Sequence, residues 1–272
     1  MSAVPGPDGG GARLVVVHPD AGVLAEAAAV RLLTRLLDTQ SVRTPVHAVL
    51  TGGTVGIRTL AAVAASPLRD AVDWAGVHLW WGDERFLPDG DPDRNETQAR
   101  SALVDALVAS AGLPAANVHA VPALGAVVDG ERIETPEQAA AAYAAELSRY
   151  AAGPEESSPD DGPAVPRFDV LLLGMGPDGH VASLFPGHVG LAAAGATVGV
   201  HGSPKPPPLR VSLTFDAIRR AREVWVVAAG AEKAAQAAAA LAGGPVAEVP
   251  AAGAYGTEHT LWLLDSAAAA QG

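Results

Sequence analysis

The chain has 272 residues and carries 18 basic against 30 acidic side chains, which gives a formal net charge of −12 at pH 7. Its hydrophobic content of 49% excludes a disordered chain, and the absence of cysteine excludes disulfides, thiolate metal ligands and cysteine nucleophiles. Because the negative charge repels phosphate backbones and anionic lipid surfaces, we expect neither nucleic acid nor membrane as a partner.

The first twelve residues are rich in Gly and Pro and lack the basic and apolar regions of a signal peptide. We therefore expect a flexible tail over residues 1–12, one domain over residues 13–272, and a cytoplasmic protein. The stretch 179–204 has no acidic residue, but Pro186 and several glycines interrupt it, so it does not predict a transmembrane helix.

Short runs of β-branched residues and leucine alternate with longer alanine- and leucine-rich stretches of helical period. This pattern predicts an α/β fold, with a mostly parallel sheet flanked by helices. The expected strands are residues 13–17, 46–50, 77–81, 169–173, 209–213, 223–227 and 260–264. The expected helices run from an Asp20 cap to about Leu37, from Asn95 to near Gly112, and from Pro136 to Tyr150. The acidic, Pro- and Gly-rich stretch 153–163 predicts a surface loop rather than a domain boundary.

A glycine-rich turn follows the second expected strand and contains Thr51-Gly52-Gly53-Thr54. Glycines let backbone N–H groups approach an anion, and the N-terminus of the next helix favours negative charge. The turn is a candidate phosphate loop, although it lacks the Gly-Lys-Ser/Thr of a Walker loop and its pattern also suits an ordinary turn between a strand and a helix.

A charged loop follows the third expected strand and contains Asp83 and Arg85. Charged loop residues are commonly just solvated, but a guanidinium group can bind a phosphate or carboxylate with two parallel hydrogen bonds. Two further basic residues, Arg210 and Lys233, follow later in the chain, the second at the expected start of a helix.

The fourth expected strand is followed by Gly174-Met175-Gly176-Pro177-Asp178-Gly179-His180, which contains a G-x-G-x-x-G pattern. A dinucleotide site requires an acidic residue about 20 positions later for the ribose hydroxyls. No Asp or Glu occurs in the stretch 179–215, so this interpretation is disfavoured. The glycines instead predict a tight turn that exposes Asp178 and His180 at the carboxyl edge of the sheet.

Taken in order, five motifs resemble the 6-phosphogluconolactonase family: Gly52-Gly53-Thr54, Gly82-Asp83-Glu84-Arg85, the stretch 174–187, the stretch 210–214 and Gly230-Ala231-Glu232-Lys233. The resemblance spans nearly the whole chain. It implies a single Rossmann-like domain that hydrolyses 6-phospho-D-glucono-1,5-lactone in the pentose phosphate pathway, without metal or cofactor. The glycine turn departs from the Ser-Gly-Gly-Ser-Thr-Pro often found in relatives.

The resemblance also implies roles for individual residues. His180 is the general acid/base, with Asp83, Arg85, Asp178 and Lys233 in the site, while Arg210, Gly52, Gly53 and Thr54 match phosphate-binding elements. We expect His180 to take a proton from the attacking water and return one to the ring oxygen. Either Asp178 or Asp83 orients its imidazole, and Arg85 either stabilises the developing charge or fixes the substrate.

Two other functions remain open on the sequence. The first is a glucosamine-6-phosphate deaminase/isomerase-like enzyme. The deaminase is similar through the same Asp-Gly-His turn, but it carries Glu where this chain has Phe185. A non-catalytic sugar-phosphate sensor requires an output domain, and no helix-turn-helix pattern precedes Arg13. The sequence leaves a monomer and a small homo-oligomer equally open.

Overall fold

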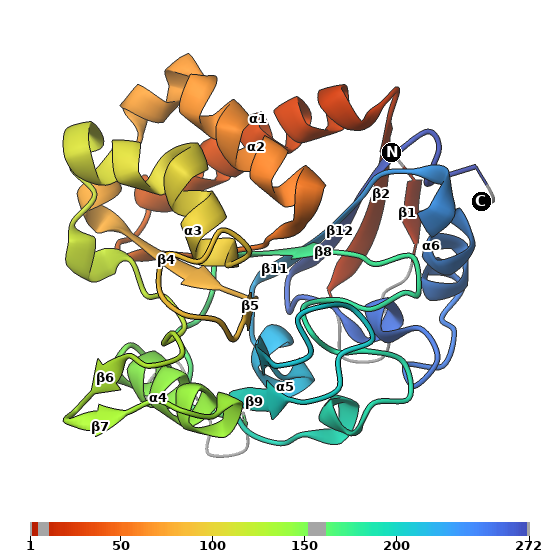
Figure 1. Ribbon diagram of the computed structural model, residues 1–272. Coiled ribbons are helices and arrows are strands. Elements are labelled where there is room, and N and C mark those ends of the chain that lie inside the picture. Colours follow the sequence, from red (N-terminus) through yellow and green to blue (C-terminus); the bar gives the residue numbers. More distant parts are fainter. Residues whose placement is uncertain (1, 5–10, 152–161, 271–272) are drawn as a thin grey trace.

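The computed structural model describes residues 2–4, 11–151 and 162–270, and a mostly parallel sheet runs through the middle of the molecule (Figure 1). In spatial order its strands are β1 (Ser2–Val4), β2 (Ala12–His18), β12 (His259–Asp265), β11 (Glu223–Ala228), β8 (Val170–Gly174), β3 (Val46–Leu50) and β4 (Val77–Trp81). In this spatial order, each strand from β2 across to β4 is parallel to its neighbour, whereas β1 is antiparallel to β2. The predicted α/β fold is confirmed.

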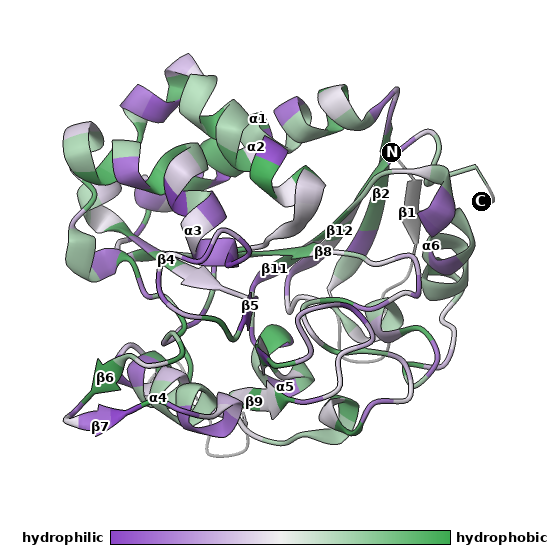
Figure 2. Ribbon diagram, viewed as in Figure 1, coloured by the Kyte–Doolittle hydropathy of each residue, from purple (hydrophilic) through white to green (hydrophobic). Residues whose placement is uncertain are grey.

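Helices cover the sheet on its two faces (Figure 1), and the central strand β8 between them is hydrophobic (Figure 2). The longer ones are α1 (Ala21–Gln40), α2 (Gly53–Ala65), α4 (Pro136–Arg149) and α6 (Ala234–Leu241), and the short ones are α3 (Asn95–Ala99) and α5 (Phe215–Ile218). On β2, Leu14 lies with α1 residues along one groove, whereas Val15 and Val17 lie with α6 residues along another. Successive side chains of a strand point to opposite faces, so β2 is covered by α1 on one face and by α6 on the other.

The helix boundaries follow the predicted signals. Asp20 caps α1 by accepting hydrogen bonds from the backbone N–H groups of Gly22 at 2.8 Å and Val23 at 2.9 Å. The helix that begins at Asn95 continues beyond α3 through π-helical turns and ends at Gly112, whose φ of +84° suits glycine.

A second, smaller sheet corrects the placement of one predicted strand. The stretch 209–213 does form a strand, β10 (Arg210–Leu213), but β10 pairs antiparallel with β5 (Asp83–Arg85) and β9 (Thr197–Val200) rather than joining the main sheet. Its apolar alternation is common to parallel and antiparallel strands, so the sequence did not distinguish them. A two-stranded hairpin of β6 (Val127–Val128) and β7 (Glu131–Arg132) completes the strands described.

The N-terminal segment also differs from its expected limits. Residues 2–4 form β1 within the stretch that we expected to be a flexible tail, and β2 begins at Ala12. An edge strand offers unpaired backbone N–H and C=O groups, and β1 pairs with those of β2. The predicted acidic loop lies largely outside the described residues. No described helix combines the length and the hydropathy needed to cross a membrane.

A stack of aromatic rings fills the space beside β3 and β4. Trp80 is fully buried, its ring stacks on His119 with centroids 3.8 Å apart, and its Nε1–H donates to His47 Nδ1 at 3.2 Å. Burial, with the nearby charges of His78, His119 and Arg43, lowers the pKa of His47 to about 3. Burial and His119 lower the pKa of His78 to about 4. The native core therefore holds these imidazoles neutral.

This core predicts a loss of stability in mild acid. In the unfolded chain a histidine takes up a proton near pH 6.5, whereas native His47 does not until about pH 3. The stabilising contribution is complete above pH 6.5 and is lost as the pH falls towards 3, at roughly 1 kcal/mol per pH unit. We expect His47→Gln to show a shallower fall in the free energy of unfolding between pH 6.5 and 5, measured by urea denaturation.

The control is His259→Gln, which changes a largely exposed histidine at the start of β12. Burial raises the pKa of Glu84 to about 7 against the opposing Arg94 and three backbone N–H groups, which gives a slope of opposite sign. The quantity to compare is therefore the difference between variant and wild type in the pH slope of the free energy of unfolding, because the Glu84 contribution is common to both. Equal slopes in His47→Gln and wild type would contradict the assignment.

Candidate active site

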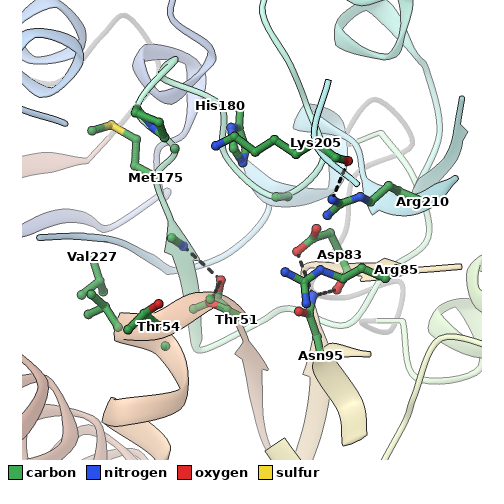
Figure 3. A pocket seen from close by; sticks show the side chains of 18 of the residues that line it. Thr51, Thr54, Asp83, Arg85, Asn95, Met175, His180, Lys205, Arg210 and Val227 are labelled. Atoms are coloured by element: carbon green, nitrogen blue, oxygen red, sulfur yellow. Dashed lines mark hydrogen bonds between the residues drawn. The ribbon is translucent and has the colours of Figure 1, made fainter. Parts of the chain in front are cut away.

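A cavity of about 280 Å³ lies at the carboxyl ends of β3, β4, β8 and β11, and Figure 3 shows it from close by. The structure brings nearly all the predicted site residues together there: Gly52, Gly53, Thr54, Asp83, Arg85, His180, Arg210 and Lys233 line the cavity. Asp178 contacts His180 instead of the cavity itself. This is the edge at which open α/β sheets bind their ligands.

His180 and Asp178 form a hydrogen-bonded pair, with His180 Nδ1 and Asp178 Oδ1 2.5 Å apart. Burial tends to raise the pKa of Asp178, but the hydrogen bond and charge of His180 and the charge of Lys205 outweigh it and lower that pKa to about 2. An ionised carboxylate only accepts hydrogen bonds, so Nδ1 carries the hydrogen and the other ring nitrogen, Nε2, is left to act as a base.

The glycines around this pair make room for it. A side chain at Gly176 would place its Cβ 2.1 Å from His180 Nδ1, so only glycine fits there. Gly179 adopts φ of +82°, which lets the chain turn back between Asp178 and His180. The backbone N–H of Gly176 then donates to the carbonyl of His180 at 2.9 Å and closes the turn. The pattern that resembles a dinucleotide fingerprint thus shapes the turn that carries the histidine.

Asp83 has a different set of partners. Its Oδ2 accepts a 2.7 Å hydrogen bond from the Ser183 hydroxyl, and its backbone carbonyl accepts one of 2.9 Å from the Asn95 side chain. The sequence left Asp83 and Asp178 as equal candidates for orienting the imidazole. In the structure, the carboxylate that accepts a hydrogen bond from His180 Nδ1 is that of Asp178. Asp83 instead joins the loop after β8 to the strand β5.

The buried side chain of Glu84 joins the strand β5 to the start of α3. Its carboxyl oxygens accept from the backbone N–H groups of Arg85 at 2.8 Å, Asn95 at 2.6 Å and Glu96 at 2.8 Å, and Arg94 lies 3.8 Å away. These contacts satisfy free N–H groups at the start of α3. They fix Asn95 against the cavity that Asp83 and Arg85 also line.

Two arginines stand side by side at the cavity. Arg85 and Arg210 are directly opposite one another in the β5–β10 pairing, an arrangement in which like charges repel. The Arg210 guanidinium donates to the backbone carbonyls of Lys205, Pro206 and Pro207, and Arg85 Nη1 donates to the carbonyl of Asp93 at 2.7 Å. Burial lowers the pKa of Arg210, opposed by Asp83 and reinforced by Arg85. A bound anion would relieve this repulsion.

The glycine-rich turn joins β3 to α2 at the floor of the cavity. The Thr51 hydroxyl accepts a 3.0 Å hydrogen bond from the backbone N–H of Gly174, which ties this turn to the end of β8. Gly52 is the N-cap of α2 and supplies no side chain, and Gly53 has φ of +79°. A Cβ at Gly52 would lie 1.9 Å from Asn95 Oδ1. The first turn of α2 therefore reaches the cavity with its backbone N–H groups free of a side-chain cap.

The sequence analysis gave no site role to two polar side chains that line the cavity, those of Asn95 and Lys205. Asn95 was recognised only as the start of a helix. Lys205 lies in a proline-rich stretch to which no role was given, although one signal was visible: the chain has only two lysines, Lys205 and Lys233, and both line the cavity. Among the described residues, no three or more His, Asp or Glu side chains are grouped so as to hold a metal ion.

A family model and several sequence relatives point to the same protein family. The family model described as glucosamine-6-phosphate isomerases/6-phosphogluconolactonase matches residues 19–262. A 6-phosphogluconolactonase from Streptomyces coelicolor is 56% identical over 94% of both chains, and one from Mycobacterium tuberculosis is 42% identical over 94% of this chain and 97% of its own.

Solved structures agree in fold. The 6-phosphogluconolactonase of Trypanosoma brucei superposes with a TM-score of 0.80 at 29% identity, covering 95% of this chain and 98% of its own. A monomeric glucosamine-6-phosphate deaminase reaches a TM-score of 0.71 at 14% identity, which shows a shared fold alone. With the family model matched from the end of β2 to β12, this chain belongs to the glucosamine-6-phosphate isomerase/6-phosphogluconolactonase family.

Proposed function

We propose that this protein is an enzyme that hydrolyses 6-phospho-D-glucono-1,5-lactone to 6-phospho-D-gluconate, the lactone-opening step of the pentose phosphate pathway. The observation that carries the proposal is the His180–Asp178 pair beside a cavity lined by four basic side chains, Arg85, Lys205, Arg210 and Lys233. In a chain of net charge −12, such a concentration of cations favours an anionic ligand. The similarity to lactonases from Streptomyces and Mycobacterium supports the same substrate.

The phosphate of the substrate fits the floor of the cavity. The free N–H groups and the dipole at the start of α2 favour an anion, and Thr54 adds a hydroxyl group. Burial lowers the pKa of Lys233, opposed by Glu232 and Asp265 and reinforced by Lys205, so its ammonium group gains from a nearby anion. We assign Gly52, Gly53, Thr54 and Lys233 to the phosphate, with Arg210 as a further cation.

The lactone carbonyl then lies against His180. In the first step, His180 Nε2 removes a proton from water as the water oxygen bonds to C1 and the carbonyl electrons move to oxygen. In the second, the bond from C1 to the ring oxygen breaks, and that oxygen takes the proton from His180. The products are one carboxylic acid and one hydroxyl group, and no covalent intermediate with the protein is needed. Asp178 stabilises the imidazolium between the two steps.

The deaminase alternative is disfavoured at Phe185. This residue occupies the position at which the related deaminases are expected to carry a glutamate, and its buried ring lies 4.6 Å from the His180 ring, centroid to centroid. A phenyl ring can neither donate nor accept a proton. Release of ammonia from glucosamine 6-phosphate would revive this alternative.

The central prediction concerns lactone hydrolysis and the role of His180 as its general base. We expect wild-type protein to accelerate release of 6-phosphogluconate from freshly generated lactone above the spontaneous rate. His180→Asn removes the proton acceptor and should lower kcat by about 10² to 10⁴-fold, measured by coupling the product to 6-phosphogluconate dehydrogenase.

The matched control is His259→Asn, because His259 lies at the start of β12, at the opposite edge of the sheet from the cavity. It should keep wild-type kcat. If folded wild-type protein gave no acceleration, the proposed function would be wrong; full activity in His180→Asn would remove only its base.

A second prediction separates binding from chemistry. Lys233→Ala removes a cation from the proposed phosphate end, and a charged hydrogen bond contributes about 1.5–3 kcal/mol, so KM should rise by roughly 10- to 100-fold while kcat changes little. The kinetic measurement is the same coupled assay over a range of substrate concentrations. Arg132→Ala, an exposed cation on the β6–β7 hairpin, is the control. An unchanged KM in Lys233→Ala would place the phosphate elsewhere.

A further inference from the structure

Lys205 lies on a segment that the structure holds firmly in place. It belongs to the proline-rich connection between β9 and β10, Pro204-Lys205-Pro206-Pro207-Pro208. The guanidinium of Arg210 fixes this connection by donating hydrogen bonds to the carbonyls of Lys205 at 3.0 Å, Pro206 at 2.9 Å and Pro207 at 3.0 Å. The backbone from which the lysine side chain starts is therefore fixed relative to β10 and to the cavity.

The side chain of Lys205 extends across the cavity towards His180 (Figure 3). Its Nζ lies 3.8 Å from Asp178 Oδ1, the oxygen that bonds to His180 Nδ1. At 3.8 Å the Lys205 ammonium is attracted by the charge of the Asp178 carboxylate but makes no hydrogen bond with it. Its three N–H donors are thus placed beside the histidine without being used by Asp178.

The other cations of the cavity are placed differently. Arg85 and Arg210 donate to backbone carbonyls and stand opposite one another on β5 and β10. Lys233 ends the turn after β11, at the start of α6. Among the described cations that line the cavity, Lys205 is the one paired with the carboxylate of the histidine pair.

We infer that Lys205 is a further catalytic residue, whose ammonium group stabilises the negative charge that forms on the lactone carbonyl oxygen when water adds to C1. This inference rests on the proposed lactonase function. As the water oxygen bonds to C1, the π electrons of the carbonyl move onto its oxygen, and Lys205 donates a hydrogen bond to that oxyanion. When the bond to the ring oxygen breaks, the carbonyl re-forms, so Lys205 gives up no proton over the cycle. A lysine presents a compact charge suited to a single oxygen.

The first test asks which end of the ligand Lys205 contacts, without using catalysis. 6-Phosphogluconate carries a carboxylate at C1, whereas D-glucitol 6-phosphate carries a neutral CH₂OH there and the same phosphate. In calorimetric titrations we expect Lys205→Met to weaken 6-phosphogluconate binding by about 10-fold and to leave glucitol 6-phosphate binding unchanged. Equal weakening of the two ligands would assign Lys205 to the phosphate and overturn the inference.

The second test separates the transition state from the ground state. Loss of one oxyanion donor costs about 10² to 10³ in rate, so Lys205→Met should lower kcat by that factor with KM within about threefold of wild type. Lys205→Arg retains a donor and should recover part of kcat. The kcat deficit of Lys205→Met should persist across the pH profile; a deficit that disappears at high pH would mean that Lys205 acts only through the histidine pair, and would overturn the inference.

The outcomes also distinguish this inference from the proposed function. If wild-type protein neither binds 6-phosphogluconate nor hydrolyses the lactone, the proposed function fails. If wild type does both and folded Lys205→Met and Lys205→Arg match it in kcat, only the role of Lys205 fails. Near-ultraviolet circular dichroism of each variant checks that it is folded.

Discussion

The parallel pairing of β3 with β4 on one side and β8 on the other is the constraint on which the site depends. It brings the ends of three strands to one edge, where the connections also bond to one another: Gly82 N donates to Leu50 O at 3.1 Å, and Gly174 N donates to the Thr51 hydroxyl at 3.0 Å. The glycine-rich turn between β3 and α2, the strand β5 and the turn that carries His180 are therefore fixed relative to one another before any ligand binds. Such preorganisation lowers the cost of orienting a substrate.

The small antiparallel sheet of β5, β10 and β9 supplies another wall of the cavity through Asp83, Arg85 and Arg210. The buried carboxyl group of Glu84 joins this sheet to the start of α3. Burying Glu84 is unfavourable in itself, as its raised pKa shows, yet three backbone N–H groups and Arg94 satisfy it. On the other face of β5, Asp83 accepts from Ser183, three residues after His180. The strands that carry Arg85 and Arg210 are thus linked to the turn that carries His180.

Local signals in the sequence predicted the main strands, the Asp20 cap and the end of the long helix at Gly112, because each depends on residues close together in the chain. The ordered motifs also contain most of the residues that line the cavity, including His180, Arg210 and Lys233. The sequence did not show that residues 210–213 leave the parallel sheet, since their pairing with β5 joins segments more than a hundred residues apart. The sequence also could not decide whether Asp83 or Asp178 orients the His180 imidazole, and it gave Lys205 no role. The contacts that decide these points join residues that the fold brings together.

In the orientation that we propose for the ligand, its phosphate lies at the start of α2 and beside Lys233, and its C1 lies beside His180 and Lys205. The most direct test is a crystal structure of the wild-type protein with 6-phosphogluconate. We expect phosphate oxygens to bind the backbone N–H groups of Gly53 and Thr54, and the C1 carboxylate to lie within hydrogen-bond distance of His180 Nε2 and Lys205 Nζ. A ligand bound in the reverse direction, with its phosphate against His180, would contradict this orientation.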